Sequence, residues 1–212
     1  MKTPVASIRL YLQTLQTRPV DEDKRAEFYR IMLADSDRLM STIDQVLRTG
    51  RLGVGHKHNF TRVDVDEVVR ASVERVRTLH RMTGDGLRFE PCGPADVLGD
   101  PEELSAAITN LVENAVKYSG PEVHVTVRTE RSGDQFVVRV TDRGPGIPKE
   151  ELKRVFRRFY RVPGPIASRV KGTGLGLFIV RTVAKRHGGR AWAESEGPGR
   201  GSTFAIQLPA AK

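Results

Sequence analysis

A predicted helix in the middle of the chain carries two asparagines and a lysine on one face. Asn110 and Asn114 are four residues apart and Lys117 follows three residues later, so all three lie near one side of the helix. Amide oxygens are hard ligands that suit Mg²⁺, and an ammonium group suits a phosphate. A merely polar helix face is the alternative, but the amides alternate with Leu111 and Ala115, which we expect to face the core.

A second cluster comes directly after a predicted strand, where Asp142 is followed by Gly144 and Gly146. A carboxylate at the end of a strand can accept a hydrogen bond from an exocyclic amine, such as that of adenine. The glycines beside it let the backbone approach a flat ligand closely. An ordinary turn has a similar sequence, so this pattern alone is weakly specific.

Two further segments could hold negative charge. Gly172–Leu177, of sequence GTGLGL, opens a helix predicted over Gly172–Arg186, and exposed amides at a helix N-terminus bind phosphate. The segment lacks the lysine–serine ending of a P-loop, and no strand directly precedes it, so neither that motif nor a dinucleotide fingerprint fits. The run Phe156–Arg161 leads into a basic stretch, 162–171, that predicts a mobile lid, with a solvated basic loop as the alternative.

Residues 60–212 predict one domain that would position all four clusters. Strands and helices are mixed in it and antiparallel hairpins are prominent, so the predicted fold class is α+β. The predicted helices span 64–82, 100–118 and 172–186, and the predicted strands span 60–63, 87–90, 96–98, 123–128, 136–141, 191–195 and 202–208.

The first 50 residues predict a hairpin of two amphipathic helices. Arg18–Pro19 stops the first helix, and the acidic residues 21–23 open the second, which we expect to end near Arg48, before Gly50. One hairpin cannot bury both apolar seams, so we expect two chains to pair as a four-helix bundle. Packing of the hairpin on its own neighbouring domain is the alternative. The seam of the first helix recurs at spacings of three and four residues, at Val5, Ile8, Leu12 and Leu15.

The two predicted helices are unequal in length. The second outruns the first by about a dozen residues, or about 20 Å. We therefore expect the natural first helix to begin upstream of Met1, which makes the hairpin of residues 1–50 truncated at its N-terminus. Residues 51–59 predict a linker. Its His56 and His58 could ligate a metal, but a solvated linker is favoured because no carboxylate or cysteine accompanies them.

Composition narrows the class of protein. A chain of 212 residues has room for one large domain or two small ones. The single cysteine, Cys92, excludes an internal disulfide framework and points to a reducing compartment. No apolar run approaches the ~20 residues of a membrane span, and no signal peptide opens the sequence. The net charge of +9 favours an acidic partner, a polyphosphate ligand or nucleic acid without choosing among them.

The order of the four clusters is far more specific than any one of them. In series over about 70 residues, they resemble the ATP-site motifs of the sensor histidine kinases of two-component systems. NLVENAVKY resembles the N box, DRGPG the first glycine box, FRRFYR the F box and GTGLGL the second glycine box. Gly201–Phe204 is similar to the closing element of the same fold, and KTPVASIRLYL to the end of the H box. The resemblance covers the whole chain.

The resemblance implies an α/β sandwich of the histidine-kinase and gyrase type, from residue 60 to 212, that binds ATP with Mg²⁺. Asn114 would ligate Mg²⁺, and Asn110 would help to position the phosphates in catalysis. Lys117 would contact phosphate and Tyr118 would pack near adenine. The remaining nucleotide-binding residues would be Asp142, Gly144 and Gly146 on the adenine amine, Gly172, Thr173, Gly174, Leu175 and Gly176 on the phosphate side, and Thr203 near the base. Phe156 and Phe159 would be packing residues that anchor the lid.

The family pattern is broken at the H box, which reads His-Glu-Leu-Lys/Arg-Thr-Pro in the family. This chain begins Met1-Lys2-Thr3-Pro4, so the acceptor histidine is absent and we expect ATP binding without autophosphorylation. Thr3 falls where the kinase-phosphatases of the family carry a threonine that orients water for dephosphorylation. A plain helix-entry residue is an equal alternative.

The implied function is the cytoplasmic kinase core of a bacterial sensor, which passes the γ-phosphoryl of ATP to a histidine and then to an aspartate of a response regulator. The implied partners are the response-regulator receiver domain and a second copy through the hairpin, with a membrane reached only through upstream segments. The alternatives are a gyrase-like ATP hydrolase and a nucleotide-binding regulator without kinase activity. The hydrolase is disfavoured because Asn110 stands where those relatives carry a glutamate base. Nucleic-acid binding is not expected, because basic residues are spread among acidic ones without a recognition motif.

Overall fold

The computed structural model describes residues 4–51, 59–82, 84–93, 96–120, 122–164, 170 and 172–211, and gives side chains for all of these except 4, 37, 38 and 40–51. Thr3, His56 and His58 lie outside this part of the chain, as do residues 165–169 and 171 of the predicted lid. The chain divides into two compact units, Met1–His56 and Lys57–Lys212. In the described ranges, no helix is both long enough and apolar enough to cross a membrane.

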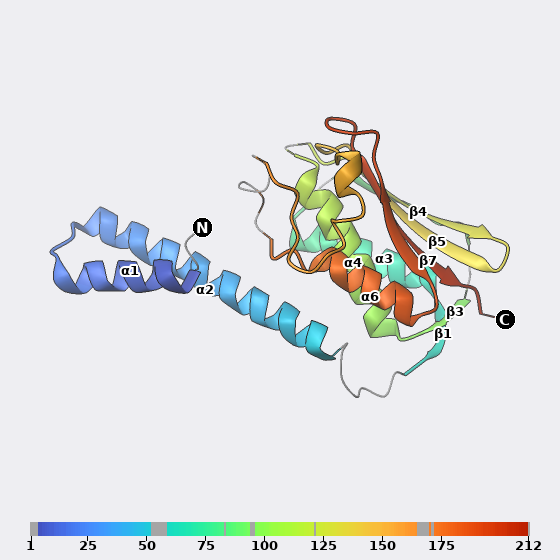
Figure 1. Ribbon diagram of the computed structural model, residues 1–212, viewed down its shortest axis with the longest axis horizontal. Coiled ribbons are helices and arrows are strands. Elements are labelled where there is room, and N and C mark those ends of the chain that lie inside the picture. Colours follow the sequence, from blue (N-terminus) through green and yellow to red (C-terminus); the bar gives the residue numbers. More distant parts are fainter. Residues whose placement is uncertain are drawn as a thin grey trace. The chain divides into compact units, whose positions relative to one another are not determined.

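The first unit is the predicted helical hairpin, made of α1 (Pro4–Thr17) and α2 (Glu22–Arg51) (Figure 1). Pro19 has no N–H to continue α1, and the Asp21 carboxylate accepts a hydrogen bond from the backbone N–H of Lys24 at 2.9 Å at the start of α2. The expected end of α2 near Arg48 is wrong. The helix continues through Gly50, because a glycine inside a helix costs only about 1 kcal/mol relative to alanine.

The apolar seam of α1 is only partly covered within one chain. Ile8 and Leu15 are half-buried, whereas Val5 and Leu12 keep 59% and 48% of their surface exposed. These open positions lie along a groove in the hairpin, with Leu39 of α2 on its other side. The groove is lined by Val5, Ile8, Arg9, Leu12, Gln13, Gln16 and Leu39.

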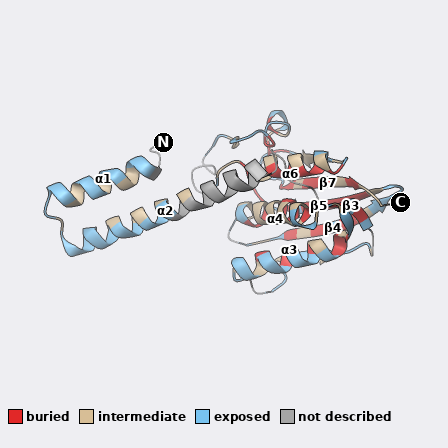
Figure 2. Cartoon of the chain, turned by 90° about the horizontal axis from the view of Figure 1, so that it is seen from below, coloured by how far each residue is buried: buried red, intermediate tan, exposed pale blue. Residues whose placement is uncertain are grey.

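The second unit contains a five-stranded sheet, and helices lie along one of its faces (Figures 1 and 2). The strand order is β2-β4-β5-β7-β6, with β2 and β4 parallel and the other neighbours antiparallel. β1 and β3 form a separate antiparallel pair. The predicted α+β class is confirmed. The elements are β1 (Thr61–Asp64), α3 (Val65–Leu79), β2 (Leu87–Glu90), β3 (Asp96–Gly99), α4 (Pro101–Tyr118), β4 (Val125–Ser132), β5 (Gln135–Asp142), η1 (Lys149–Glu151), α6 (Gly176–Arg186), β6 (Arg190–Glu194) and β7 (Ser202–Pro209).

Aspartates fix the starts of two of the helices. The Asp64 side chain accepts a hydrogen bond from the backbone N–H of Asp66 at 2.9 Å, and the Asp100 side chain accepts one from Glu102 at 3.0 Å. Each cap satisfies a donor that the first turn of a helix leaves unpaired. The core then forms between the helices and the sheet. Its largest members are Leu104, Ile108 and Leu111 of α4, Phe136 of β5, and Ile206 and Leu208 of β7.

A buried histidine joins the end of α6 to the start of α4. His187 accepts a hydrogen bond at Nε2 from the backbone N–H of Asp100 at 3.0 Å, and its Nδ1 lies 2.9 Å from the carbonyl of Val183. Because Nε2 is an acceptor, the ring is neutral and carries its proton on Nδ1. Phe60 stacks on the ring at 4.8 Å between centroids. Burial lowers the pKa of His187, against a smaller opposite effect of the Val183 carbonyl and Glu103.

We expect the free energy of unfolding of the second unit to fall as the pH decreases below 6.5, the ordinary histidine pKa. The unfolded chain takes up a proton there, whereas folded His187 stays neutral to a lower pH, so acid favours unfolding. His187→Gln should flatten this dependence between about pH 7.5 and 5.5. The measurement is urea unfolding followed by the fluorescence of Trp192, the only tryptophan. The exposed His124→Gln is the control, and an undiminished slope in His187→Gln would contradict the assignment.

Candidate functional site

The amide face of α4 lies at the edge of the core. Leu111 and Ala115 are fully buried, and Asn110 and Asn114 between them are half-buried, as the alternation predicted. The Asn110 amide nitrogen donates to the carbonyl of Ala106 at 2.8 Å, which leaves its carbonyl oxygen directed outward from the turn. Within the described residues no group hydrogen-bonds the Asn114 side chain. Its amide oxygen is therefore available to a ligand or a metal.

Lys117 and Tyr118 occupy the C-terminal end of the same face. The Lys117 ammonium pairs with the Glu113 carboxylate one turn earlier. This pair is partly exposed, so its contribution is small and it can open when another anion is offered. The half-buried Tyr118 turns its backbone carbonyl towards Gly144, where an added Cβ would lie only 2.5 Å from that oxygen. The end of α4 thus contacts bare backbone of the first glycine segment.

Asp142 ends β5 with its carboxylate buried. One carboxylate oxygen accepts a hydrogen bond from the backbone N–H of Gly144 at 2.7 Å. Burial raises the pKa of the Asp142 carboxyl, and backbone N–H groups of Gly144 and Ser202 offset part of that rise. A buried carboxylate with capacity left on its oxygens is suited to accept from a donor on a ligand.

The register of β5 and β7 decides which residue stands beside Asp142. Ser202 lies opposite Asp142, and Thr203 lies opposite Thr141. Neighbouring residues of a strand point to opposite faces, so Thr203 lies on the other side of the sheet from Asp142, where its hydroxyl is 2.9 Å from that of Thr141. The buried Ser202 therefore shares a face of the sheet with Asp142, and Thr203, which was expected near the base, does not. The alternation with Phe204 in the sequence already carried this signal.

The second glycine segment meets α4 from the other side. The helix predicted from Gly172 begins only at Gly176, so residues 172–175 form the turn that precedes it. Leu175 is fully buried and anchors that turn, and its backbone N–H lies 3.4 Å from the hydroxyl of Thr173. An added Cβ on Gly176 would lie 2.8 Å from the Asn110 amide oxygen, so the start of α6 lies directly against the amide face.

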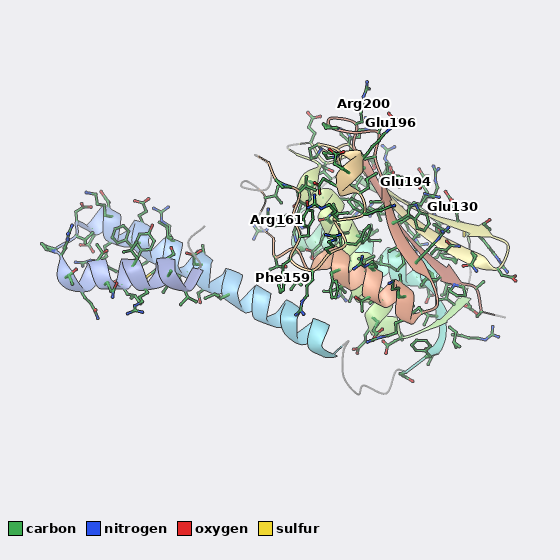
Figure 3. The ribbon with its side chains drawn as sticks, viewed as in Figure 1. Glu130, Phe159, Arg161, Glu194, Glu196 and Arg200 are labelled. Atoms are coloured by element: carbon green, nitrogen blue, oxygen red, sulfur yellow. The ribbon has the colours of Figure 1, made fainter. Side chains whose placement is uncertain are left out.

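The aromatic and basic segment is fastened to the same turn. The backbone N–H of Phe159 donates to the carbonyl of Gly174 at 3.0 Å. Phe156 is buried with its ring edge towards Phe204, as expected of a packing residue. Phe159 is different: 56% of its surface is exposed, and it is held to the turn through its backbone rather than by burial of its ring. Figure 3 shows Phe159 and Arg161 in this region, and the Arg161 guanidinium donates to the carbonyl of Val170 within the predicted lid.

Three contacts therefore bring the four clusters together. The amide face of α4 contacts Gly176, the end of α4 contacts Gly144, and the aromatic segment is bonded to Gly174. The resulting site offers amide oxygens, a lysine, a buried carboxylate and the N-terminus of α6. Such a set can hold a polyanion at one end and a hydrogen-bond donor of a flat group at the other.

Two protein families match the chain. "Histidine kinase-, DNA gyrase B-, and HSP90-like ATPase" matches residues 99–212, and "His Kinase A (phospho-acceptor) domain" matches residues 1–55. The sensor-like histidine kinase SenX3 of Mycolicibacterium smegmatis is 37% identical over 216 residues, which is 99% of this chain and 54% of SenX3. The chain thus spans about half the length of that relative.

Several solved structures resemble the whole chain in fold, and two of them illustrate this. Histidine kinase ThkA in complex with response regulator protein TrrA superposes with a TM-score of 0.77 at 20% identity, covering 98% of this chain and 58% of that one. Full-length ShkA in complex with AMPPNP superposes with a TM-score of 0.71 at 24% identity, covering 100% of this chain and 42% of that one. At these identities the likeness shows the fold.

The close approach at Gly146 yields a test of the site's backbone. Gly146 has φ of 69°, and an added Cβ would lie 2.0 Å from the carbonyl oxygen of Gly197. Gly133 has φ of 58° with no atom within 4 Å of that position, which makes it a matched control for backbone strain alone. We expect Gly146→Ala to cost about 3 kcal/mol and Gly133→Ala about 1 kcal/mol. Urea unfolding measures both, and equal losses would contradict the described packing.

Proposed function

The chain belongs to the sensor histidine kinases of two-component systems, and on that premise we propose that it binds Mg-ATP as the kinase core of such a sensor. In the whole protein, the γ-phosphoryl group passes to a histidine and then to an aspartate of a response regulator. The observation that carries the proposal is the placement of α4 between two glycine segments. Its amide face lies against Gly176 and its C-terminal end against Gly144.

The adenine end of the site is built around Asp142. Its ionised carboxylate accepts a hydrogen bond from the exocyclic amine of adenine. The same carboxylate also accepts the hydrogen bond from the Gly144 N–H. Gly144 and Gly146 keep side chains out of the base pocket, and Tyr118 packs at its border. Ser202, beside Asp142 in the register, takes the place first expected for Thr203.

The phosphate end lies between α4 and the start of α6. The backbone of the turn at residues 172–176 presents N–H groups there, and the positive end of α6 favours negative charge. Lys117 leaves its exposed pair with Glu113 to contact a phosphate oxygen. Asn110 orients the phosphates from the face next to Gly176.

The residues present fit a magnesium ion that arrives with the nucleotide. The unbonded amide oxygen of Asn114 is a hard ligand of the kind Mg²⁺ prefers, and the remaining ligands come from phosphates and water. Bound Mg²⁺ supplies neutralisation of the charge on the transferring phosphoryl group. Asn114 would hold the ion, and Asn110 and Lys117 would hold the phosphates.

Phosphoryl transfer is favoured over hydrolysis by the chemistry of α4. An amide at Asn110 cannot take a proton from water, which a hydrolase base must do. The carboxylate nearest along the helix, Glu113, is next to Asn114 in the sequence, and adjacent residues of a helix point in different directions. The site therefore binds and orients ATP, and leaves the nucleophile to another part of the protein.

The hairpin is the surface for a second copy and for the response regulator. The open groove along Val5 and Leu12 is apolar and continues onto α2 at Leu39. A second hairpin covers such a seam in a four-helix bundle. ThkA, which shares the fold, was solved with its response regulator TrrA, which supports a receiver domain as partner here.

Replacing Asn114 tests the magnesium site. We expect Asn114→Ala to weaken Mg-ATP binding about tenfold and to leave the affinity for ATP without metal unchanged, because only the ion loses a ligand. Titration with a fluorescent ATP analogue, with Mg²⁺ and with a chelator, measures both affinities. Asn59→Ala, an exposed asparagine outside the site, is the control. An equal loss under both conditions would remove Asn114 from the metal site.

Replacing Leu12 tests the paired hairpins. Leu12 and Leu10 are exposed to similar extents, 48% and 44%, but only Leu12 lines the groove. We expect Leu12→Glu to raise the dimer dissociation constant at least about tenfold, because burial of a leucine is replaced by burial of a charge. Leu10→Glu should leave it unchanged. Sedimentation equilibrium decides the matter, and a monomeric wild type or equal effects of the two variants would refute this interface.

A further inference from the structure

The loop between β6 and β7, residues 195–201, lies directly on the turn that follows Asp142. The backbone N–H of Gly199 donates to the carbonyl of Pro145 at 2.6 Å, and that of Gly201 donates to the carbonyl of Gly144 at 3.2 Å. An added Cβ on Gly201 would lie 2.2 Å from the backbone oxygen of Asp142. The loop therefore packs against the backbone of Asp142 and of the two turn residues Gly144 and Pro145.

One side chain ties this loop and the turn together. The Ser195 hydroxyl accepts hydrogen bonds from the backbone N–H groups of Ile147 at 3.0 Å and Gly197 at 3.2 Å, and donates to the carbonyl of Gly201 at 2.7 Å. A hydroxyl has one proton to donate and two lone pairs to accept with, so all its capacity is used. Ile147 closes the glycine turn, and Gly201 directly precedes Ser202. The hydroxyl thus joins the two backbone segments that flank the buried carboxylate.

The position of the Asp142 carboxylate depends on those same segments. The backbone N–H of Gly144 in the turn donates to it at 2.7 Å, and the backbone N–H of Ser202 at the end of the loop also lowers its pKa. Backbone donors move only when the backbone moves. A change in the distance between the turn and the loop therefore changes the orientation of the Asp142 carboxylate. Arg200 and Glu196, on the same loop, are exposed and project from the domain (Figure 3). Their side chains therefore do little to fix the distance between the loop and the turn.

We propose that Ser195 is a positioning residue for base recognition, which holds the Asp142 carboxylate in line with the exocyclic amine of adenine. The inference rests on the proposed nucleotide site and assigns its base selectivity to a residue that does not touch the nucleotide. Loss of the hydroxyl leaves two N–H groups and a carbonyl without this partner, and the spacing of turn and loop then depends on the bonds from Gly199 to Pro145 and from Gly201 to Gly144 alone. The selectivity for an amine-bearing base then falls more than the overall affinity.

The test compares ATP with ITP, whose hypoxanthine base carries a keto oxygen in place of the amine. Competition with a fluorescent ADP analogue on the full chain gives both affinities. In the wild type we expect ATP to bind at least about tenfold more tightly than ITP, because a site built to accept from an amine rejects a base lacking it. In Ser195→Ala the ratio should fall about fivefold. Because the ratio is taken on the same folded molecules, partial unfolding does not change it.

Three further variants complete the test. Ser195→Cys keeps the size of the side chain but has only a weak donor and acceptor, so it should also lower the ratio of ATP to ITP affinity. It replaces Ser195→Ala in the test if that variant does not fold. Ser195→Thr keeps the hydroxyl and should have the wild-type ratio of ATP to ITP affinity. Ser72→Ala removes another buried hydroxyl, remote from the site, and should leave it unchanged.

The outcomes separate the inference from the proposed function. A wild type that binds no ATP overturns the proposed function itself. A wild type that binds ATP with no preference over ITP shows that Asp142 does not read the base, and overturns the inference. A preserved ratio in both Ser195→Ala and Ser195→Cys shows that the hydroxyl does not position the carboxylate, and also overturns it.

Discussion

The structure of the second unit depends on how closely helix α4 can approach bare backbone. At Gly144 and Gly176 a side chain would occupy space already taken by the Tyr118 carbonyl and the Asn110 amide. Because protein interiors are close-packed, neither segment can move away without opening the core beneath it. Gly144 is thus required by the approach of α4, and Gly176 lies against the polar face of the same helix, which forms one wall of the site.

The buried Asp142 makes a second demand on the backbone. A carboxylate removed from water is costly unless N–H groups point at it, and here Gly144 and Ser202 supply them. The same donors set where the carboxylate points. The stability of the buried carboxylate and its recognition of a ligand therefore depend on the same hydrogen bonds. The Ser195 hydroxyl connects the turn to the loop between β6 and β7 through its bonds to Ile147 and Gly201.

The two units bury their apolar side chains in different ways. The second unit buries its apolar residues between one face of a sheet and three helices, and needs no partner for its core. The hairpin has no such sheet, and Val5 and Leu12 remain open to solvent along its groove. A helical pair with an uncovered seam is suited to assembly, because a second copy supplies the apolar surface that one chain lacks.

The sequence alone determined much of this protein. The α+β class, the starts of the helices near residues 64 and 100, and the buried positions of Leu111 and Ala115 follow from local periodicity and capping, which act over a few residues. The order of the four motifs was sufficient to indicate the family. These features need no knowledge of which segments meet in space.

Only the tertiary structure decided the finer placements. Ser202 rather than Thr203 stands beside Asp142 because the register of β5 on β7 fixes which face each residue occupies, and a shift of one residue would exchange them. α6 starts at Gly176 rather than Gly172 because the turn before it is held by Phe159 and the buried Leu175. Phe159 is exposed because its backbone, rather than its ring, makes the contact with Gly174. The pairing of Ser202 with Asp142 and the bond from Phe159 to Gly174 both join residues that are separated in the chain, and such contacts form only when the chain folds.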